Sequence, residues 1–387
     1  MKARSIKGNS TEEIKNALQQ SMADGYQPTL AIVFMSVKQD REAVSKLLDD
    51  NGIQIFGATT AGEFIDGEME AGSIVILLLD MNPTCFKIEF LETSQETALE
   101  DAIKLGIAGK ETFNSPAFII ANSGVALDGE PFVEGIIQGF GKHTSSPEKE
   151  VTIFGGKAAD DLALESTFVF TNGKSNNSAL VALIIDEDKI DVKGIATCGW
   201  KAIGTTKTVT KSEGNIVYTI DDKPALDTLM NYLGVEIKQE GNKDIVTFLS
   251  SWYYPLQVER ENVDPVIRTA MFANREERSL ICSGKVPQGS KIRFSLPPDF
   301  DSIDTVVADC KSIKENAQQQ AEALIMFSCV SRHLSFGAVM KEEIEQVQQI
   351  WDAPMAGFFS YGEYGKSKTG RYDYHNNTCC LVVLKEK

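Results

Sequence analysis

Residues 56–64 read FGATTAGEF, and residues 356–364 read AGFFSYGEY. When the two stretches are aligned on Gly57 and Gly357, the second glycine and the acid that follows it also coincide. Glycine adopts backbone conformations that other residues avoid, so a Gly-x4-Gly-Glu pattern is typical of a tight turn. Its recurrence 300 residues later indicates that the chain repeats a structural unit.

The sequence around each turn predicts the same order of elements, αβαββ. The N-terminal copy has predicted helices at 10–22 and 43–51 and predicted strands at 30–34, 53–56 and 73–79. The C-terminal copy has predicted helices at 303–313 and 344–351 and predicted strands at 323–327, 353–357 and 379–384. An intermediate copy has predicted helices at 96–109 and 132–140 and predicted strands at 117–121, 151–154 and 179–185. In this copy the turn reads GGKAADD, at residues 155–161, without the Gly-Glu pair.

This alternation of strands and helices predicts an α/β (mixed α+β) fold, in which repeated αβαββ units form mixed sheets covered by helices. The two strands of each β-α-β segment are expected to be parallel, and the strand after the turn antiparallel. Residues 224–300 are a candidate for a fourth, degraded copy. The polar segment TIDDKPA predicts a domain boundary near residue 220, which gives domains of residues 1–220 and 221–387.

Composition excludes several classes of function. The net charge of −17 argues against a nucleic-acid partner and against binding to anionic membranes. Neither a secretory leader nor an apolar run long enough to span a bilayer is present, so no membrane insertion is expected. The seven scattered cysteines lack a CxxC pair, which indicates a reduced, cytoplasmic protein. No pattern predicts a metal site or a cofactor, and GGK lacks the rest of a Walker A motif.

Ligands of parallel β-α-β units usually bind beyond the carboxyl ends of the strands, so the polar residues at these ends are the candidate ligand-binding residues. They are Thr59, Thr60, Glu63, Asn122, Ser123, Asp160, Ser328, Arg332, Ser360, Glu363, His375 and Asn376. Small hydroxyls, amides, carboxylates and one arginine suit a small polar solute.

Each of these assignments has a structural alternative. The planar guanidinium of Arg332 can clamp a ligand carboxylate, or it can form an ion pair with an acid of the protein. Glu63 and Glu363 can face a ligand, or they can be ordinary turn residues. His375 and Asn376 can donate hydrogen bonds to a ligand or complete a hairpin turn.

A catalytic centre is a weaker interpretation of the same segments. Cys329 lies four residues before His333, but this spacing does not establish the spatial partner that a thiolate nucleophile needs. Ser331 has no identifiable base. We therefore expect no catalytic residues, with Cys329 as nucleophile or Glu363 as general base kept as the enzymatic alternative.

From about residue 28 onward, the chain contains these segments in order: LAIVF, IFGATTAGEF, ANSG, IFGGKAADD, CGWKAIG, TVTKSEGNIVYTIDDKPALDTL, FSCVSRHLSFG, MAGFFSYGEYG and YHNNTCCLVVL. With this set of segments the chain resembles the FIST (F-box and intracellular signal transduction) sensory domain with its N- and C-terminal parts. The resemblance implies a cytoplasmic sensor of a small ligand, such as an amino acid or a related compound. It also implies a separate signalling output protein as a partner.

The leading hypothesis is thus a stand-alone, non-enzymatic sensor of a small zwitterion. Arg332 would bind the carboxylate, Glu63 or Glu363 the amine, and the hydroxyls and amides would orient the ligand. An enzyme acting on a similar solute and a protein-binding scaffold remain the alternatives.

Overall fold

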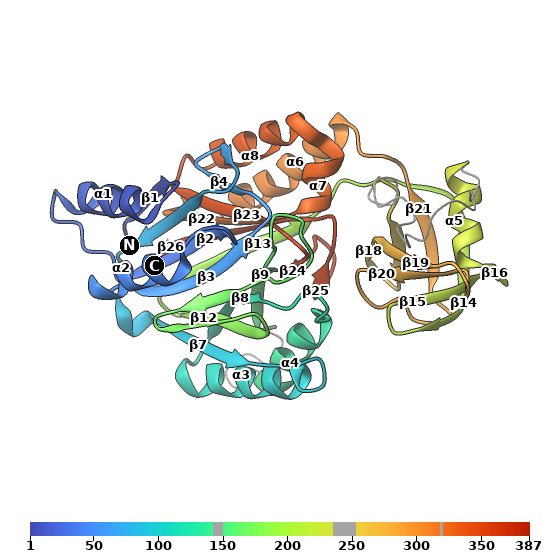
Figure 1. The fold of residues 1–387 in the computed structure, drawn as a ribbon, viewed down its shortest axis with the longest axis horizontal. Coiled ribbons are helices and arrows are strands. Elements are labelled where there is room, and N and C mark those ends of the chain that lie inside the picture. The colour runs from blue at the N-terminus through green and yellow to red at the C-terminus, as the bar shows by residue number, and fades with distance from the viewer. Residues whose placement is uncertain (142–149, 235–252, 318–319) are drawn as a thin grey trace.

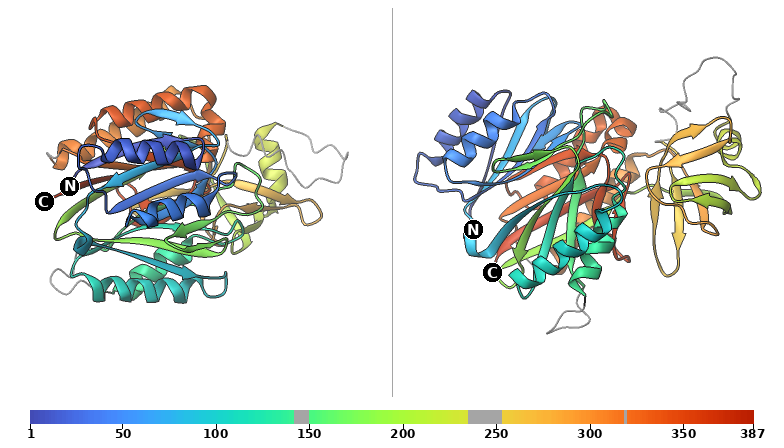
Figure 2. Two further views of the ribbon diagram at one scale, coloured as in Figure 1. Left: turned by 60° about the vertical axis from the view of Figure 1, so that its left-hand side comes forward. Right: turned by 60° about the horizontal axis from the view of Figure 1, so that its bottom comes forward.

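A computed structural model describes residues 1–141, 150–234, 253–317 and 320–387. Two parts are visible (Figure 1): a large body of sheets and helices, built from both ends of the chain, and a smaller β-rich part on the right. The N- and C-termini lie close together on the body (Figures 1 and 2), where the Met1 amino group forms an ion pair with Glu386. No helix of the described ranges is long and apolar enough to cross a membrane.

The body contains three six-stranded sheets, each formed around one predicted unit. The first sheet has the order β1 (Ala3–Gly8), β6 (Ile74–Leu79), β2 (Leu30–Ser36), β3 (Gln54–Thr60), β10 (Val169–Thr171), β11 (Lys174–Asn176). The second has the order β25 (Tyr372–His375), β24 (Glu363–Lys366), β9 (Thr152–Lys157), β8 (Pro116–Asn122), β12 (Ala179–Asp186), β7 (Phe86–Glu92). The third has the order β13 (Ile190–Thr197), β26 (Cys379–Glu386), β22 (Ala323–Cys329), β23 (Met355–Ser360), β4 (Glu63–Ile65), β5 (Glu68–Glu70).

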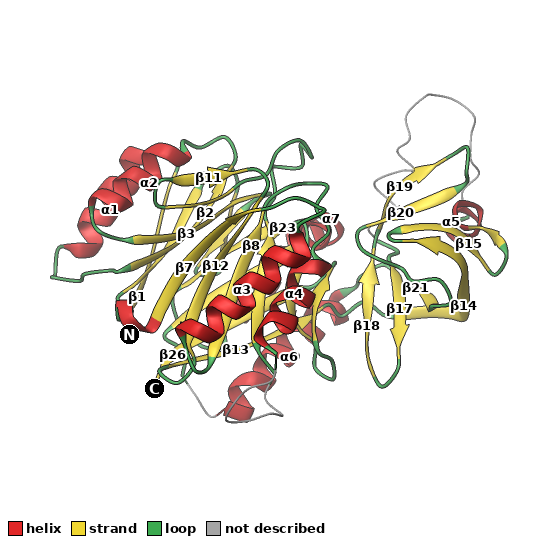
Figure 3. Ribbon diagram, turned by 90° about the horizontal axis from the view of Figure 1, so that it is seen from below, coloured by secondary structure: helices red, strands yellow, loops and turns green. Residues whose placement is uncertain are grey.

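Each sheet has the predicted β-α-β arrangement at its centre. The pairs β2–β3, β8–β9 and β22–β23 are parallel, and β6, β12 and β26 run antiparallel beside the first strand of their pair. The α/β prediction is therefore confirmed. A helix pair covers the outer face of each sheet (Figures 1 and 3). These helices are α1 (Thr11–Met22) and α2 (Arg41–Asp50); α3 (Ala98–Thr112) and α4 (Glu130–Phe140); α6 (Phe300–Ala317) and α8 (Met340–Gln349).

The inner faces of the three sheets share one core. Alternate residues of the central strands meet there, among them Phe34, Phe154, Phe327 and Phe358. Three further cores fill the spaces between each sheet and its helices. The central strands β2, β8 and β22 are buried on both faces, which is why they read as continuous apolar runs in the sequence.

The segments that follow the glycine turns leave their own sheets. Strand β4 follows β3 of the first sheet but pairs with β23 of the third. Strand β24 follows β23 but pairs with β9 of the second sheet, and β10 follows β9 but pairs with β3 of the first. The three sheets thus exchange edge strands in a closed ring, and each turn is a crossing point between two sheets.

In the two Gly-x4-Gly-Glu turns, the first glycine makes room for the crossing strand. Gly357 pairs with Phe64, and a Cβ atom on Gly357 would lie 2.0 Å from the Phe64 ring. Gly57 meets Phe170 in the same way, at 2.3 Å. The glycine is needed here for space, and Gly62, with φ of +118°, is needed for the turn itself.

The second part is an eight-stranded sheet packed on helix α5 (Ala225–Leu233). Its strands are β14 (Ala202–Glu213), β15 (Ile216–Ile220), β16 (Lys223–Pro224), β17 (Leu256–Arg260), β18 (Val263–Arg268), β19 (Ala270–Asn274), β20 (Ser279–Cys282) and β21 (Lys291–Ser295). All pairs among the described strands of this part are antiparallel, so they do not repeat the β-α-β unit that was considered for residues 224–300. The predicted boundary at 220/221 falls in the turn between the paired strands β15 and β16, and residues 300–387 belong to the body.

The remaining helical segments are short. They are η1 (Pro83–Cys85), α7 (Val330–Phe336) and η2 (Gly337–Val339). Helix α7 follows β22 directly and carries the predicted site residue Arg332.

Candidate functional site

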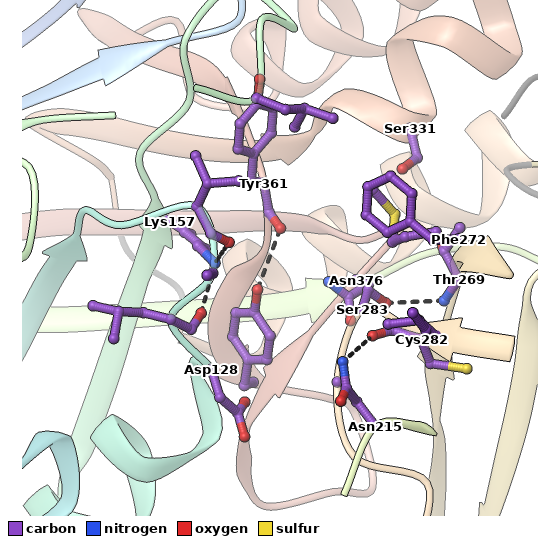
Figure 4. Close-up of a pocket in the computed structure, with 18 of the residues that line it drawn as sticks. Asp128, Lys157, Asn215, Thr269, Phe272, Cys282, Ser283, Ser331, Tyr361 and Asn376 are labelled. Atoms are coloured by element: carbon purple, nitrogen blue, oxygen red, sulfur yellow. Dashed lines mark hydrogen bonds between the residues drawn. The ribbon is translucent and has the colours of Figure 1, made fainter. Parts of the chain in front are cut away.

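A cavity of about 650 Å³ lies between the body and the β-rich part. On the body side it is lined by the loop after β8, the segment after β9, the start of α7, Tyr361 at the β23–β24 crossing, and the end of β25. On the other side it is lined by the β14–β15 turn, by β19 and β20, and by the loop after β20 (Figure 4). The body wall is therefore at the carboxyl ends of parallel strands, where α/β proteins usually bind ligands.

Lys157, the last residue of β9, is the cation that the body contributes to this wall (Figure 4). Lys157 is 5% exposed. The ammonium donates to the backbone carbonyls of Val125 at 2.8 Å and Leu127 at 2.6 Å, and no carboxylate of the described residues lies within ion-pair distance. Burial lowers the pKa of Lys157 to about 8, against a smaller opposing effect of Asp128.

Two tyrosines complete the floor beside Lys157. Tyr361 donates from its hydroxyl to Asp160 at 2.5 Å, and the Tyr374 hydroxyl donates to the Tyr361 carbonyl at 3.2 Å. Asp160 also accepts hydrogen bonds from three successive backbone N–H groups, of residues 164–166. This network fixes the loop after β9, so the wall is held in place without a ligand.

The wall from the β-rich part is held equally firmly. Ser283 accepts a hydrogen bond from the Thr269 backbone N–H at 2.9 Å, and Asn215 donates to the Cys282 carbonyl at 2.9 Å. Beside these polar groups, Met271, Phe272 and Ile281 present apolar side chains to the cavity. Phe272 is 40% exposed, which is unusual for a phenylalanine and consistent with an accessible apolar wall.

Direct contacts join the two parts next to the cavity. The buried guanidinium of Arg268 pairs with Glu130 of α4 and donates to the Tyr374 carbonyl at 3.2 Å. The Thr269 hydroxyl donates to Asn377, and Arg260 pairs with Asp373. A ligand in the cavity would touch residues adjacent to these contacts on both sides.

Glu63 and Glu363 occupy equivalent, fully buried positions at two of the crossings. The Glu63 carboxylate accepts from the Thr60 hydroxyl and from the backbone N–H and hydroxyl of Ser73, at 3.0 and 2.9 Å. Glu363 accepts from the Ser360 hydroxyl at 2.6 Å and from the backbone N–H and hydroxyl of Thr378, at 3.2 and 2.7 Å.

These carboxylates tie each crossing strand to the next strand of its own unit. Burial raises the pKa of both acids to about 7. The cavity wall does not include Glu63, Glu363, Thr60 or Ser360.

Arg332 is also fully buried, and it forms a bidentate ion pair with Glu343 of α8. It donates two further hydrogen bonds, to the carbonyls of Cys198 at 2.6 Å and Asn377 at 3.1 Å. Four of the five N–H donors of the guanidinium are therefore used within the protein. This geometry matches the ion-pair alternative.

The other predicted residues are buried in the strand ends. Thr59 bonds with the backbone of Phe168, and Ser123 with the backbone of β12. Asn122 accepts from the Tyr364 hydroxyl at 2.7 Å, and the His375 ring contacts the Gly365 carbonyl at 3.1 Å. The Ser328 hydroxyl has no hydrogen-bond partner among the described residues.

Asn376 is the predicted residue that lines the cavity, and Asp160 reaches it through Tyr361. Cys329 and Ser331 also lie on the wall. Burial raises the pKa of the Cys329 thiol to about 12, so this cysteine stays protonated near neutral pH, and that disfavours it as a nucleophile.

Sequence reasoning missed Lys157, Tyr361 and the whole wall from the β-rich part. The strand register gives a signal that could have found Lys157. Lys157 of β9 is structurally equivalent to Thr59 of β3 and Phe359 of β23. In each of these strands, the residue immediately before this position pairs with a crossing strand. Lys157 is charged, whereas Thr59 and Phe359 are not. A charged residue at the end of a buried strand is a signal that this position has a different role in the second unit.

Comparison with known families gives two adjacent matches. The family model described as the FIST N domain matches residues 29–223, and the one described as the FIST C domain matches residues 225–366. No relative was found among curated proteins.

Proposed function

The chain belongs to the FIST family, whose domains are associated with signal transduction, and on this premise we propose that it senses a small metabolite bound in the cavity between its two parts. The observation that carries the proposal is a cavity of about 650 Å³ at the carboxyl ends of the strands, with walls from both parts. This volume lies within the range of small-ligand sites.

The proposed ligand is a small polar metabolite, such as an amino acid or a related compound. Lys157 would bind an anionic group, and Asn376 and Ser331 would supply further hydrogen bonds. Of the residues predicted from the sequence, Asn376 is the proposed direct contact. The others would hold the strand ends around which the cavity forms.

Occupancy would be signalled through the arrangement of the two parts. A ligand that contacts both walls stabilises the arrangement of the two parts in which it can contact both walls at once. Two contacts between the parts lie beside the cavity, the ion pair Arg268–Glu130 and the hydrogen bond Thr269–Asn377. Ligand binding would therefore change the geometry of these two contacts. The output would be read by a separate signalling protein, and we propose a cytoplasmic location.

A ligand screen with a blocked cavity tests the proposal. Thermal unfolding of the purified protein is recorded with single amino acids and related metabolites, because a ligand that binds the native state raises the midpoint. Ala126 is exposed and lines the cavity, so Ala126→Trp should abolish the shift without unfolding the protein. Ala71→Trp, in an exposed loop outside the cavity, is the control and should leave the shift unchanged. Shifts that persist in Ala126→Trp, or a screen with no shift at all, would contradict a sensor acting through this cavity.

A further inference from the structure

The proposed function leaves the chemical class of the ligand open, and the charges and surfaces of the cavity restrict it. Resting on that function, we propose that the ligand is a small monoanion with an apolar tail, whose carboxylate binds Lys157 and whose tail contacts the wall of the β-rich part. An amino group on the ligand is not required for binding.

Lys157 is a buried cation without an anionic partner among the described residues. An ammonium has three N–H donors, and two of them bond to the carbonyls of Val125 and Leu127. The third donor remains for a ligand in the cavity that Lys157 lines. A buried charge is costly unless it is paired, so an anion placed here relieves a penalty that the empty protein carries.

The position of Lys157 in the fold supports a role in binding. Its structural equivalents do other work: Thr59 bonds with the Phe168 backbone, and Phe359 packs against Phe64 in the core beneath α8. The second unit also has Ala158 and Ala179 where the other units have the hydroxyls that hold Glu63 and Glu363. This unit therefore lacks the buried carboxylate arrangement and has a cation at the cavity wall instead.

The acid of the cavity is already engaged. The Asp128 carboxylate accepts the Glu130 backbone N–H at 3.0 Å and lies 3.8 Å from the Lys285 ammonium. Lys285 is also 3.7 Å from Glu130, so Lys157 is the lining cation that has no carboxylate partner among the described residues. This balance favours a ligand with one net negative charge over a zwitterion, whose ammonium would have to compete for Asp128.

The rest of the wall suits an apolar tail. The apolar side chains come from the loop after β9, from α7 and from the β-rich part: Leu162, Leu164, Val330, Met271, Phe272 and Ile281. Covering this surface removes it from water, which supplies affinity roughly in proportion to the area buried. Met271, Phe272 and Ile281 lie on the wall opposite Lys157, so a ligand anchored at Lys157 whose tail contacts them bridges the two parts.

Three probes with the same isobutyl tail separate the contributions: isocaproate, its amine-bearing analogue L-leucine, and the neutral isocaproamide. Calorimetric titration of the wild-type protein should show isocaproate binding at least as tightly as leucine and about tenfold or more tightly than isocaproamide, the usual effect of a charge-assisted hydrogen bond. Lys157→Met should remove this preference and leave isocaproamide binding within about threefold. The control Lys46→Met removes an exposed cation of α2, outside the cavity, and should change isocaproate binding by less than about threefold.

The outcomes distinguish this inference from the proposed function. Equal binding of isocaproate and isocaproamide, or clear preference for leucine, overturns the monoanion inference while the sensor proposal stands. The same holds if none of the three binds and the wider screen finds another ligand that lacks an apolar-tailed carboxylate. If no compound binds at all, both fail. The wild-type comparison decides the question even if Lys157→Met does not fold.

Discussion

Phe64 packs against Gly357. Strand β4, which leaves the first sheet, thus covers the glycine of β23 that precedes the crossing from the third sheet into the second. The two residues pair across antiparallel strands, and a side chain on Gly357 would also meet the carbonyl oxygen of Met326 at 2.3 Å. The repeated glycine turn thus serves the exchange of strands between sheets. Phe64 and Gly357 are both buried, so a side chain added at position 357 would overlap the ring and the backbone oxygen.

Gly357→Ala should destabilise the protein strongly. The added Cβ atom overlaps both the Phe64 ring and a backbone oxygen, and overpacking of this kind costs about 1–3 kcal/mol or more. Denaturant unfolding measures the effect. In the double variant Gly357→Ala/Phe64→Leu, only part of the loss should return, because the clash with the backbone oxygen remains. A loss below about 0.5 kcal/mol in the single variant would contradict the crossing geometry.

The two buried glutamates should make stability depend on pH. The folded-state pKa of about 7 lies above the ordinary value of 4.5, so the folded protein holds protons that the unfolded chain releases. The free energy of unfolding should therefore fall as pH rises from about 5 to about 7, by up to about 1.4 kcal/mol per pH unit for each group.

Denaturant unfolding of Glu63→Gln/Glu363→Gln over the same pH range provides the comparison. Its slope should be flatter than that of the wild-type protein, because glutamine does not titrate. The exposed Glu12→Gln is the matched control and should keep the wild-type slope. Parallel slopes for all three proteins would show that the two carboxyls titrate normally.

Substitution of Arg332 and its partner Glu343 can distinguish a structural role of Arg332 from a role in ligand binding. Arg332→Met leaves Glu343 buried and unpaired, which should cost about 3–5 kcal/mol. Arg332→Met/Glu343→Leu removes both charges and should recover most of that loss. The ligand-induced thermal shift of the double variant should match that of the wild-type protein. Loss of the shift in a stable double variant would restore Arg332 as a ligand contact.

Much of the body could be predicted from the sequence because its signals are local. The apolar runs of β2, β8 and β22 and the helices after them carry their own periodicity, and strand polarity alone indicates the edge where the cavity lies. The crossing strands β4, β10 and β24 have only three or four residues each. A segment this short shows no periodicity in the sequence. The strand with which it pairs depends on a glycine in another unit.

The individual site residues were harder to predict for a related reason. Polar residues at a strand end alternate between two faces, and the sequence does not say which face meets a cavity. Glu63 and Glu363 turn inward to hold a crossing, whereas Lys157 reaches the wall. The opposite wall comes from antiparallel strands near residues 270–285, whose position over the body depends on tertiary contacts such as Arg268–Glu130.

Binding of an anionic ligand should weaken in alkaline solution. Lys157 must be protonated to attract a carboxylate, and burial holds its pKa at about 8, below the usual range of a lysine. Asp128 and Lys285 are the other charged groups of the wall, and Tyr361 and Tyr374 have pKa values raised by burial, so they remain neutral through this range. The dissociation constant of isocaproate should therefore rise with pH above about 8, approaching tenfold per unit at higher pH. Isocaproamide in the wild-type protein, and isocaproate in Lys157→Met, should show no such rise. A flat profile for isocaproate in the wild-type protein would mean that its carboxylate binds elsewhere.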